Sequence, residues 1–261
     1  MESIRQPAVA GLFYPADPRE LRIQIREFLT DAKRREPLPK AIVAPHAGYI
    51  YSGPIAGSAY AQIVPLAGRV RRVVLLGPAH RIAFCGLAYS SDCGLRTPLG
   101  DVEVDREALY ALADLPQVRE LDLPFNGEHC LEVQLPFLQT LLTAFKVVPL
   151  LVGEAEASAV AEVLERLWGG EETLIVISSD LSHYLDYATA RTLDAETSAA
   201  IEGLQPEAIG HHQACGRNPL NGLLMAARRH GLRATTLDLR NSGDTAGPRT
   251  QVVGYGAYVF S

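Results

Sequence analysis

The sequence predicts an α/β protein with a central, largely parallel or mixed sheet and helices on both faces of that sheet. Three observations support this fold class. Apolar runs of strand length alternate with longer segments of helical periodicity, as in βαβ units. Several of these runs are continuously apolar, which is typical of strands covered on both faces. No Gly-, Ser- or Pro-rich linker and no internal repeat interrupts the 261 residues, so we expect one domain, 1–261.

Seven apolar runs are the expected strands. In chain order they are 41–44, 72–76, 86–89, 147–152, 174–178, 234–239 and 252–260. Their lengths fall in the range usual for strands of globular proteins.

Seven segments between these runs have helical character. The best marked is 16–35, with Asp17 as N-cap, Pro18 in the first turn and Glu20 at the third helical position. The others are 54–63, 106–113, 132–144, 155–167, 187–203 and 219–230. The segment 98–128 is the least regular and is interpreted as an insertion or a lid.

Composition excludes several classes of protein. The net charge is −6 and the basic residues are spread along the chain, so the basic stripe of a nucleic-acid-binding protein is missing. No apolar run approaches the roughly 18 residues of a membrane span, and the first residues lack the features of a signal peptide. The four cysteines form no CxxC pair, which favours reduced thiols and a cytoplasmic location.

Reactive side chains follow several of the expected strands. His46 follows the run 41–44, His80 follows 72–76, and Asp180 and His183 follow 174–178. Ligands of open α/β sheets bind beyond the carboxyl ends of the strands, so we expect these residues to converge. Three imidazoles, or two with a carboxylate or thiolate, are a usual ligand set for a catalytic transition metal. Histidine is also the natural general base near neutral pH.

Two further segments carry candidate residues, each with a structural alternative. Glu128, His129 and Glu132 begin an amphipathic segment, where the two carboxylates could simply complement a helix dipole. Asp244 lies in a Gly-containing turn before the last strand, where Asp is common for conformational reasons. Asp180 could likewise be a helix N-cap.

The remaining histidines and two of the cysteines carry weaker signals. Cys215 precedes a helix whose N-terminus could lower a thiol pKa, although a free cysteine is more often a small buried apolar residue. Cys130, next to His129, is similarly ambiguous. His211, His212 and His230 are expected to face solvent. The motifs HExxH, GxSxG, GxGxxG and the P-loop are absent, which removes the sequence evidence for a zincin, a serine hydrolase, a dinucleotide fold and a nucleotide-phosphate loop.

An ordered set of motifs resembles the Memo family, whose bacterial and archaeal members are labelled AmmeMemoRadiSam system protein B. The motifs are "AGLFYP", "APHAGYIYSG", "LLGPAH", "TPLGDVEVD", "EHCLEVQLPFL", "VPLLVG", "SSDLSHY", "CGRNPL" and "NSGD…VVGYGAY". They extend from about residue 6 to the C-terminus. The resemblance implies a fold similar to that of class III extradiol dioxygenases, which are non-haem iron enzymes that open catechol rings.

The resemblance also implies a metal site. His46 and His80 match metal-liganding histidines, and Fe(II) is the expected metal, with copper as an alternative. Eukaryotic relatives supply a cysteine ligand from the loop before the last strand. This chain has no cysteine there, and Asp244 is the expected oxygen ligand in its place.

The catalytic residues implied by the resemblance are His183 or His129 as base or substrate-positioning group, with Asp180 as orienting residue and Glu128 beside His129 in the pocket. We therefore expect a metal-dependent oxidoreductase of dioxygenase type.

Two alternatives remain open. One is a non-enzymatic module that binds a peptide or partner through Tyr49, Tyr51, Arg81 and Arg96. The other is a metal-assisted hydrolase that uses a bound hydroxide. The resemblance separately implies an association with a radical-SAM protein.

Overall fold

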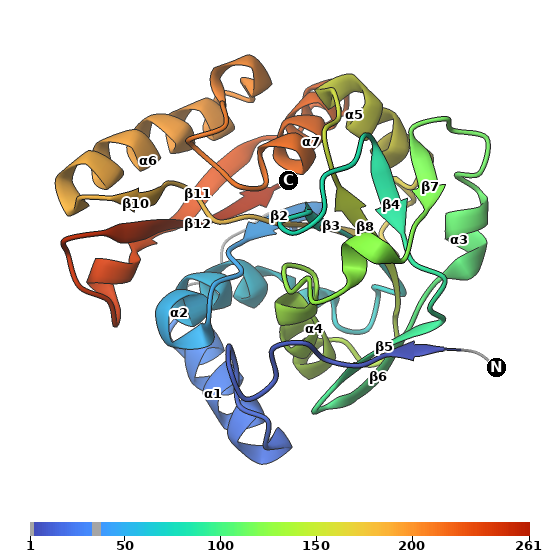
Figure 1. Ribbon diagram of the computed structural model, residues 1–261, viewed down its shortest axis with the longest axis horizontal. Coiled ribbons are helices and arrows are strands. Elements are labelled where there is room, and N and C mark those ends of the chain that lie inside the picture. Colours follow the sequence, from blue (N-terminus) through green and yellow to red (C-terminus); the bar gives the residue numbers. More distant parts are fainter. Residues whose placement is uncertain (1–2, 33–37) are drawn as a thin grey trace.

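A computed structural model describes residues 3–32 and 38–261 of the chain. Its centre is a mixed sheet with the strand order β10-β12-β2-β9-β3-β8-β4-β7, in which β11 also pairs with β12. Helices α5, α6 and α7 lie on one side of this sheet and α1, α2 and α4 on the other (Figure 1). The predicted α/β class is confirmed, and the sheet is mixed.

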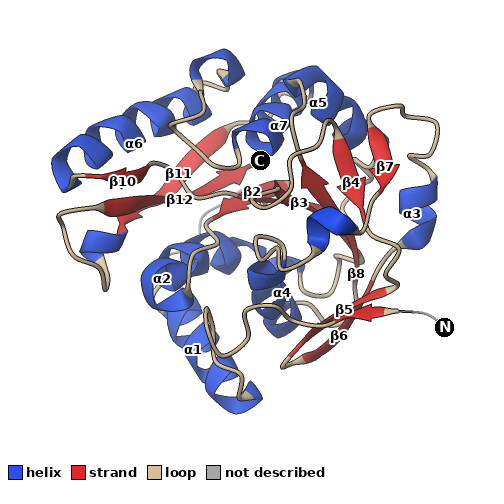
Figure 2. Cartoon of the chain, in the orientation of Figure 1, coloured by secondary structure: helices blue, strands red, loops and turns tan. Residues whose placement is uncertain are grey.

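The elements have the following bounds. The strands of the main sheet are β2 (Ala41–Ala44), β3 (Arg72–Pro78), β4 (Leu87–Tyr89), β7 (Val118–Glu120), β8 (Lys146–Val152), β9 (Thr173–Ser178), β10 (His183–Leu185), β11 (Ala234–Asn241) and β12 (Val252–Phe260). A small second sheet contains β1 (Ile4–Arg5), β5 (Gly94–Thr97) and β6 (Gly100–Glu103), and the two sheets stand out in Figure 2. The α-helices are α1 (Pro18–Thr30), α2 (Tyr49–Tyr60), α3 (Arg106–Tyr110), α4 (Leu135–Leu141), α5 (Ala157–Arg166), α6 (Tyr187–Glu202) and α7 (Arg217–Arg229). The 3₁₀ turns are η1 (Ala61–Leu66), η2 (Leu123–Phe125), η3 (Glu132–Gln134), η4 (Pro206–Ala208) and η5 (Ser242–Asp244).

Four central strands run in the same direction. β2 pairs with β9, β9 with β3 and β3 with β8, all in parallel, whereas β12 is antiparallel to β2 and β4 is antiparallel to β8. Ala44 lies opposite Ser178, and Leu76 lies opposite Ile177. The parallel strands therefore end at one edge of the sheet, and the loops that leave them begin side by side.

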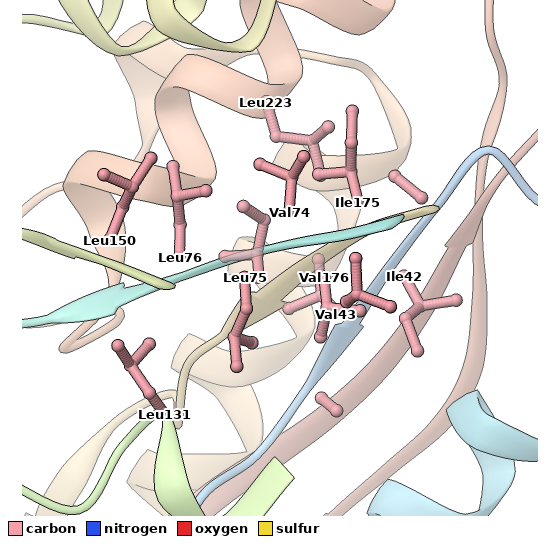
Figure 3. Close-up of a cluster of buried hydrophobic side chains, with 14 of the residues drawn as sticks. Ile42, Val43, Val74, Leu75, Leu76, Leu131, Leu150, Ile175, Val176 and Leu223 are labelled. Carbon is pink, nitrogen blue, oxygen red and sulfur yellow. The ribbon is translucent and has the colours of Figure 1, made fainter. Parts of the chain in front are cut away.

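Because consecutive residues of these strands are apolar, each strand places apolar side chains on both faces of the sheet. Val74 and Leu76 point from β3 toward the helix that carries Leu223, and Leu75 points to the opposite face (Figure 3). These four side chains are fully buried. Each contributes about 1.5–3 kcal/mol to folding through burial. This two-sided core holds the carboxyl ends of the strands in place.

The predicted elements are present, with differences at their ends. Asp17 caps α1 by accepting hydrogen bonds from the amides of Arg19 and Glu20, while positions 33–35 of the predicted segment lie outside the described residues. Helix α2 begins at Tyr49, five residues before the predicted start, because its apolar residues occur on all sides and give no periodicity. The expected helix 132–144 is divided into η3 and α4.

The segment 98–128 is not a lid, in contrast to the prediction. It contributes β6 to the small sheet, then α3, and then β7, which pairs with β4 and extends the main sheet. Val104 also forms a bridge with Val147 of β8. These strands are too short to give a sequence pattern.

Within the described part of the chain, no helix is long and apolar enough to cross a membrane.

Candidate metal centre

Three histidine rings meet beyond the carboxyl ends of the parallel strands. His46 follows β2 by two residues and His80 follows β3 by two residues, while His129 lies in the loop before η3. The ring centroids are separated by 5.1 Å for His46 and His80, 5.7 Å for His46 and His129, and 5.2 Å for His80 and His129. The shared direction of the strands brings these loops together.

Cys215 completes a group of possible ligands with two of these histidines. Its Sγ lies 3.3 Å from His46 Nε2, and one ligand atom each of His46, His80 and Cys215 lies within 4.8 Å of the others. The approach depends on Gly216, whose amide donates to Ser179 Oγ at 3.0 Å. A Cβ at position 216 would lie 2.6 Å from Ser179 Cβ, so a side chain there would push the loop away from β9.

The hydroxyl of Ser178 determines which nitrogen of His46 carries the proton. Ser178 Oγ donates its one hydrogen to the Cys130 carbonyl at 2.6 Å and accepts from Gln134 Nε2 at 2.8 Å. His46 Nδ1 lies 2.9 Å from the same oxygen and must therefore be the donor. His46 Nε2 is left with a lone pair directed toward Cys215, as a metal ligand requires.

Glu128 determines in the same way which nitrogen of the His80 ring carries the proton. Burial alone would raise the pKa of Glu128, but hydrogen bonds from His80 and from backbone amides, together with the charge of His80, hold the pKa well below its usual range. The ionised carboxylate only accepts hydrogen bonds, so His80 Nδ1, at 2.9 Å from Oε1, is the donor. In the neutral ring, His80 Nε2 then carries the lone pair that a metal ligand requires.

The structure therefore places Glu128 as an orienting residue. Glu128, His80 and His129 also lie within ligand distance of one another. However, the Glu128 oxygens already accept the amides of His80, His129 and Cys130 at 2.7, 2.8 and 3.1 Å. A carboxylate held in this way fixes a ring in place, as in the carboxylate–histidine pairs of known metal sites.

The ring of His129 lies beside the ligand group, and among the described residues no strong hydrogen bond to its ring nitrogens is found. Its ring stacks on the His80 ring with an interplanar angle of 14°. The Phe13 ring meets it edge-on, with 4.8 Å between the two ring centroids. Its Nδ1 is 3.5 Å from Glu128 Oε1, which is too long for a good hydrogen bond. Burial lowers the pKa of His129, so the neutral ring is favoured. A neutral half-buried imidazole can accept a proton or bind a metal.

Asp180 and His183 lie in the segment 179–183 that follows β9, and His183 is also the first residue of β10. Asp180 Oδ1 accepts the His46 amide at 2.8 Å, and Oδ2 is 4.0 Å from His46 Nε2. Burial raises the pKa of Asp180, against the effect of the His46 hydrogen bond. His183 Nδ1 lies 2.8 Å from the Leu181 carbonyl and must donate to it, which leaves Nε2 as the basic atom of the neutral ring.

Asp244 lies elsewhere, although it was the expected third ligand. It forms part of a capping box in η5 and accepts hydrogen bonds from the Asn241 amide at 3.1 Å and from the Tyr187 hydroxyl at 2.5 Å. Neither ligand group found among the described residues includes it. The position expected for Asp244 is taken by Cys215. The sequence signals for Cys215 were its place before a helix and its position in the family motif "CGRNPL".

The residues of the predicted peptide-binding alternative do not form one surface. The Tyr49 side chain is buried and donates to the Val133 carbonyl, and Arg96 pairs with Asp101 on the small sheet. Tyr51 and Arg81 remain exposed. His211, His212 and His230 are exposed, as predicted.

A cavity of about 180 Å³ lies against Cys215. It is bounded by residues that follow β3 and β8, including Ala79, Phe84 and Gly153, and by Arg217 at the start of α7. A larger cavity of about 730 Å³ lies around Arg72 and Lys146, the first residues of β3 and β8, and so at the opposite edge of the sheet. The smaller cavity is the one next to the ligand group.

The donor atoms fit a transition metal. Two imidazole nitrogens with oriented lone pairs and one sulfur suit borderline or soft ions better than Mg²⁺ or Ca²⁺. Burial, followed by the charge of Asp180, raises the pKa of the Cys215 thiol, so binding a metal would require the thiol to lose its proton.

Comparison with known proteins agrees with the arrangement of the motifs. A family model described as Memo-like protein matches residues 5–259. A MEMO1 family protein of Archaeoglobus fulgidus is 37% identical over 268 residues, which cover 98% of this chain and 99% of the relative. A MEMO1 family protein of Aquifex aeolicus is 37% identical over 270 residues, with the same coverage. One from Methanopyrus kandleri is 35% identical over 279 residues, 98% of each chain. The chain therefore belongs to the Memo-like family.

Proposed function

We propose that this protein is a metal-dependent oxidoreductase of dioxygenase type, with one iron or copper ion held by His46, His80 and Cys215. The observation that carries the proposal is the 3.3 Å approach of Cys215 Sγ to His46 Nε2, within a group that also contains His80. A sulfur ligand favours copper more than a set with only nitrogen and oxygen would.

The surrounding residues have separate roles. Ser178 and Glu128 hold the two ligand rings with their Nε2 lone pairs directed inward. His129, neutral beside the ligands, and His183, with a free Nε2, are the candidate bases that accept a substrate proton. When bound, a redox-active metal would supply open coordination positions and electron transfer.

Metal binding is tested first. Protein loaded anaerobically with Fe(II) or Cu(I) is expected to retain about one ion per chain. The variants His46→Ala, His80→Ala and Cys215→Ala are expected to lose it. Asp244→Asn and Cys93→Ala are the matched controls and should retain it. Retention of the ion by Cys215→Ala would refute the ligand assignment.

Activity is tested separately, as oxygen uptake by the loaded protein with catechols and related substrates. Metal-dependent uptake supports an oxidoreductase. A preference for Zn²⁺ together with indifference to oxygen would instead indicate metal-assisted hydrolysis.

A second candidate is an accessory protein that binds a peptide or a partner such as a radical-SAM protein. The exposed apolar side chains of Leu12, Ile50, Tyr51 and Tyr184 are its candidate contacts. In that case partner binding should be the same with and without a chelator, and Tyr51→Ala should weaken it. Binding that requires the metal would remove this candidate.

A further inference from the structure

The loop that follows β9 positions two of the three proposed ligands. The Ser179 amide donates to the Ala44 carbonyl at 3.0 Å, at the end of β2. Asp180 Oδ1 accepts the His46 amide at 2.8 Å, and Ser179 Oγ accepts the Gly216 amide at 3.0 Å. Movement of this loop would therefore shift His46 and the residue next to Cys215 at the same time.

The far end of the same loop is fixed by β12 and α6. Gly254 of β12 accepts the Leu181 amide and donates to the Ser182 carbonyl, each at 2.8 Å. The Ser182 amide donates to Asp194 Oδ1 of α6 at 3.0 Å. Asp194 is the side chain that connects this helix to the loop.

Asp194 is an unusual residue for this position. Its side chain is only 2% exposed, and no Lys, Arg or His forms an ion pair with it within residues 3–32 and 38–261. Burying an unpaired carboxylate is costly. Gly254 makes room for it, because a Cβ at position 254 would overlap the Asp194 carboxylate. The buried carboxylate of Asp194 and the missing side chain at Gly254 are both explained if the Ser182 amide must be held in place.

We propose that Asp194 is a positioning residue of the metal centre, which fixes the loop 179–183 and through it His46 and Cys215. This inference rests on the proposed metal site. The contribution of Asp194 is its acceptor oxygen, so an amide of the same shape can replace it. Partners that hydrogen-bond directly to a metal ligand typically change metal affinity by about 10- to 100-fold, and Asp194 acts one step further away, so we expect the lower figure.

The first test measures affinity for the metal alone, by competition with a chelator, using Co(II) to report the site by its absorption. Asp194→Ala is expected to weaken binding about tenfold and to alter the Co(II) spectrum. Asp194→Asn should stay within about twofold of the wild type because it retains the acceptor.

Ser198→Ala is the matched control for this test, since Ser198 lies on the same helix and its buried hydroxyl bonds to the Tyr258 hydroxyl, away from the loop. Equal affinities for Asp194→Ala and Ser198→Ala would overturn the proposal. Should Asp194→Ala fail to fold, Gly254→Ala displaces the carboxylate without removing it, and unchanged affinity in that variant would also overturn the proposal.

The second test needs no metal and so separates this inference from the proposed function. Amide hydrogen exchange of His46 and Ser182 is measured in the metal-free protein. Asp194→Ala should accelerate exchange at both positions relative to Ser198→Ala. Wild-type exchange rates at His46 would refute the proposal, whether or not the protein binds a metal.

Discussion

The orientation of His46 can be tested by replacing Ser178 with alanine. Ser178 is fully buried, and its hydroxyl makes three hydrogen bonds, to His46 Nδ1, Gln134 Nε2 and the Cys130 carbonyl. In Ser178→Ala, Gln134 Nε2 keeps its bond to the Pro45 carbonyl at 3.0 Å. The Nδ1–H of the His46 ring and the Cys130 carbonyl both lose Ser178 Oγ as their hydrogen-bond partner.

The size of the effect follows from these two groups. A buried polar group left without a partner costs about 1–3 kcal/mol, so for these two groups the free energy of unfolding should fall by about 2–6 kcal/mol. His46 can reduce the cost by moving its proton to Nε2, but this nitrogen then has no lone pair for a metal. We therefore expect metal affinity to fall by about 10- to 100-fold.

Three measurements test this chain of reasoning. Long-range ¹H–¹⁵N correlation spectra should show the His46 proton on Nδ1 in the metal-free wild type and partly on Nε2 in Ser178→Ala. Urea unfolding and chelator competition give the stability and the affinity. Ser198→Ala is the control: its buried hydroxyl bonds to the Tyr258 hydroxyl and not to His46, so its removal should leave the His46 proton on Nδ1 and the metal affinity unchanged. A wild-type His46 protonated on Nε2 would refute the reasoning.

Three further predictions concern the supports of the site. Burial raises the pKa of Asp194, so this group stabilises the fold below about pH 4 and loses that contribution as the pH rises through its folded pKa. In urea unfolding, Asp194→Asn should thus be more stable than the wild type at pH 7 and lose this advantage toward pH 4; lower stability at pH 7 would contradict it. Gly216→Ala, with a Cβ 2.6 Å from Ser179 Cβ, should cost about 1–3 kcal/mol and weaken metal binding, and an unchanged Co(II) spectrum would argue against the close contact. Glu132 accepts two backbone amides and the Tyr14 hydroxyl from the N-terminal segment, so Glu132→Gln should cost about 1.5–3 kcal/mol and speed proteolytic cleavage in that segment.

The parts of the fold that depend on a repeated pattern could be predicted from the sequence. The run 41–44 is β2, and the other central strands differ from their predictions by at most two residues, because burial on both faces leaves continuous apolar letters. The strands β1, β5, β6, β7 and β10 have only two to four residues. β5 and β6 form a hairpin, whereas β1, β7 and β10 pair with strands distant in the chain. Such strands have no pattern of their own.

The residues of the candidate site divide in the same way, into those that a sequence pattern indicates and those that only the packing of the chain brings together. His46 and His80 could be placed because each directly follows a strand whose direction the sequence suggested. Cys215 could not, because its approach to His46 depends on how α7 packs against the end of β9 and on the missing side chain of Gly216. Asp244 was favoured because its loop precedes the last strand, but its carboxylate is used in a local cap.

The hydrogen bonds that orient the ligands come from residues of the protein itself, and this leads to a last prediction. His46, His80 and the loop of Cys215 are held by Ser178, Glu128 and Ser179 from the protein itself. Binding should therefore raise the free energy of unfolding by mass action alone, about 2.7 kcal/mol at a metal concentration of 100 times Kd, with no change in the urea m-value. A zinc-finger-like site would instead fold on binding. A site that is already in place has little left to order when the metal binds. If metal loading instead strongly slows amide hydrogen exchange in the ligand loops, the metal assembles the site and this prediction is wrong.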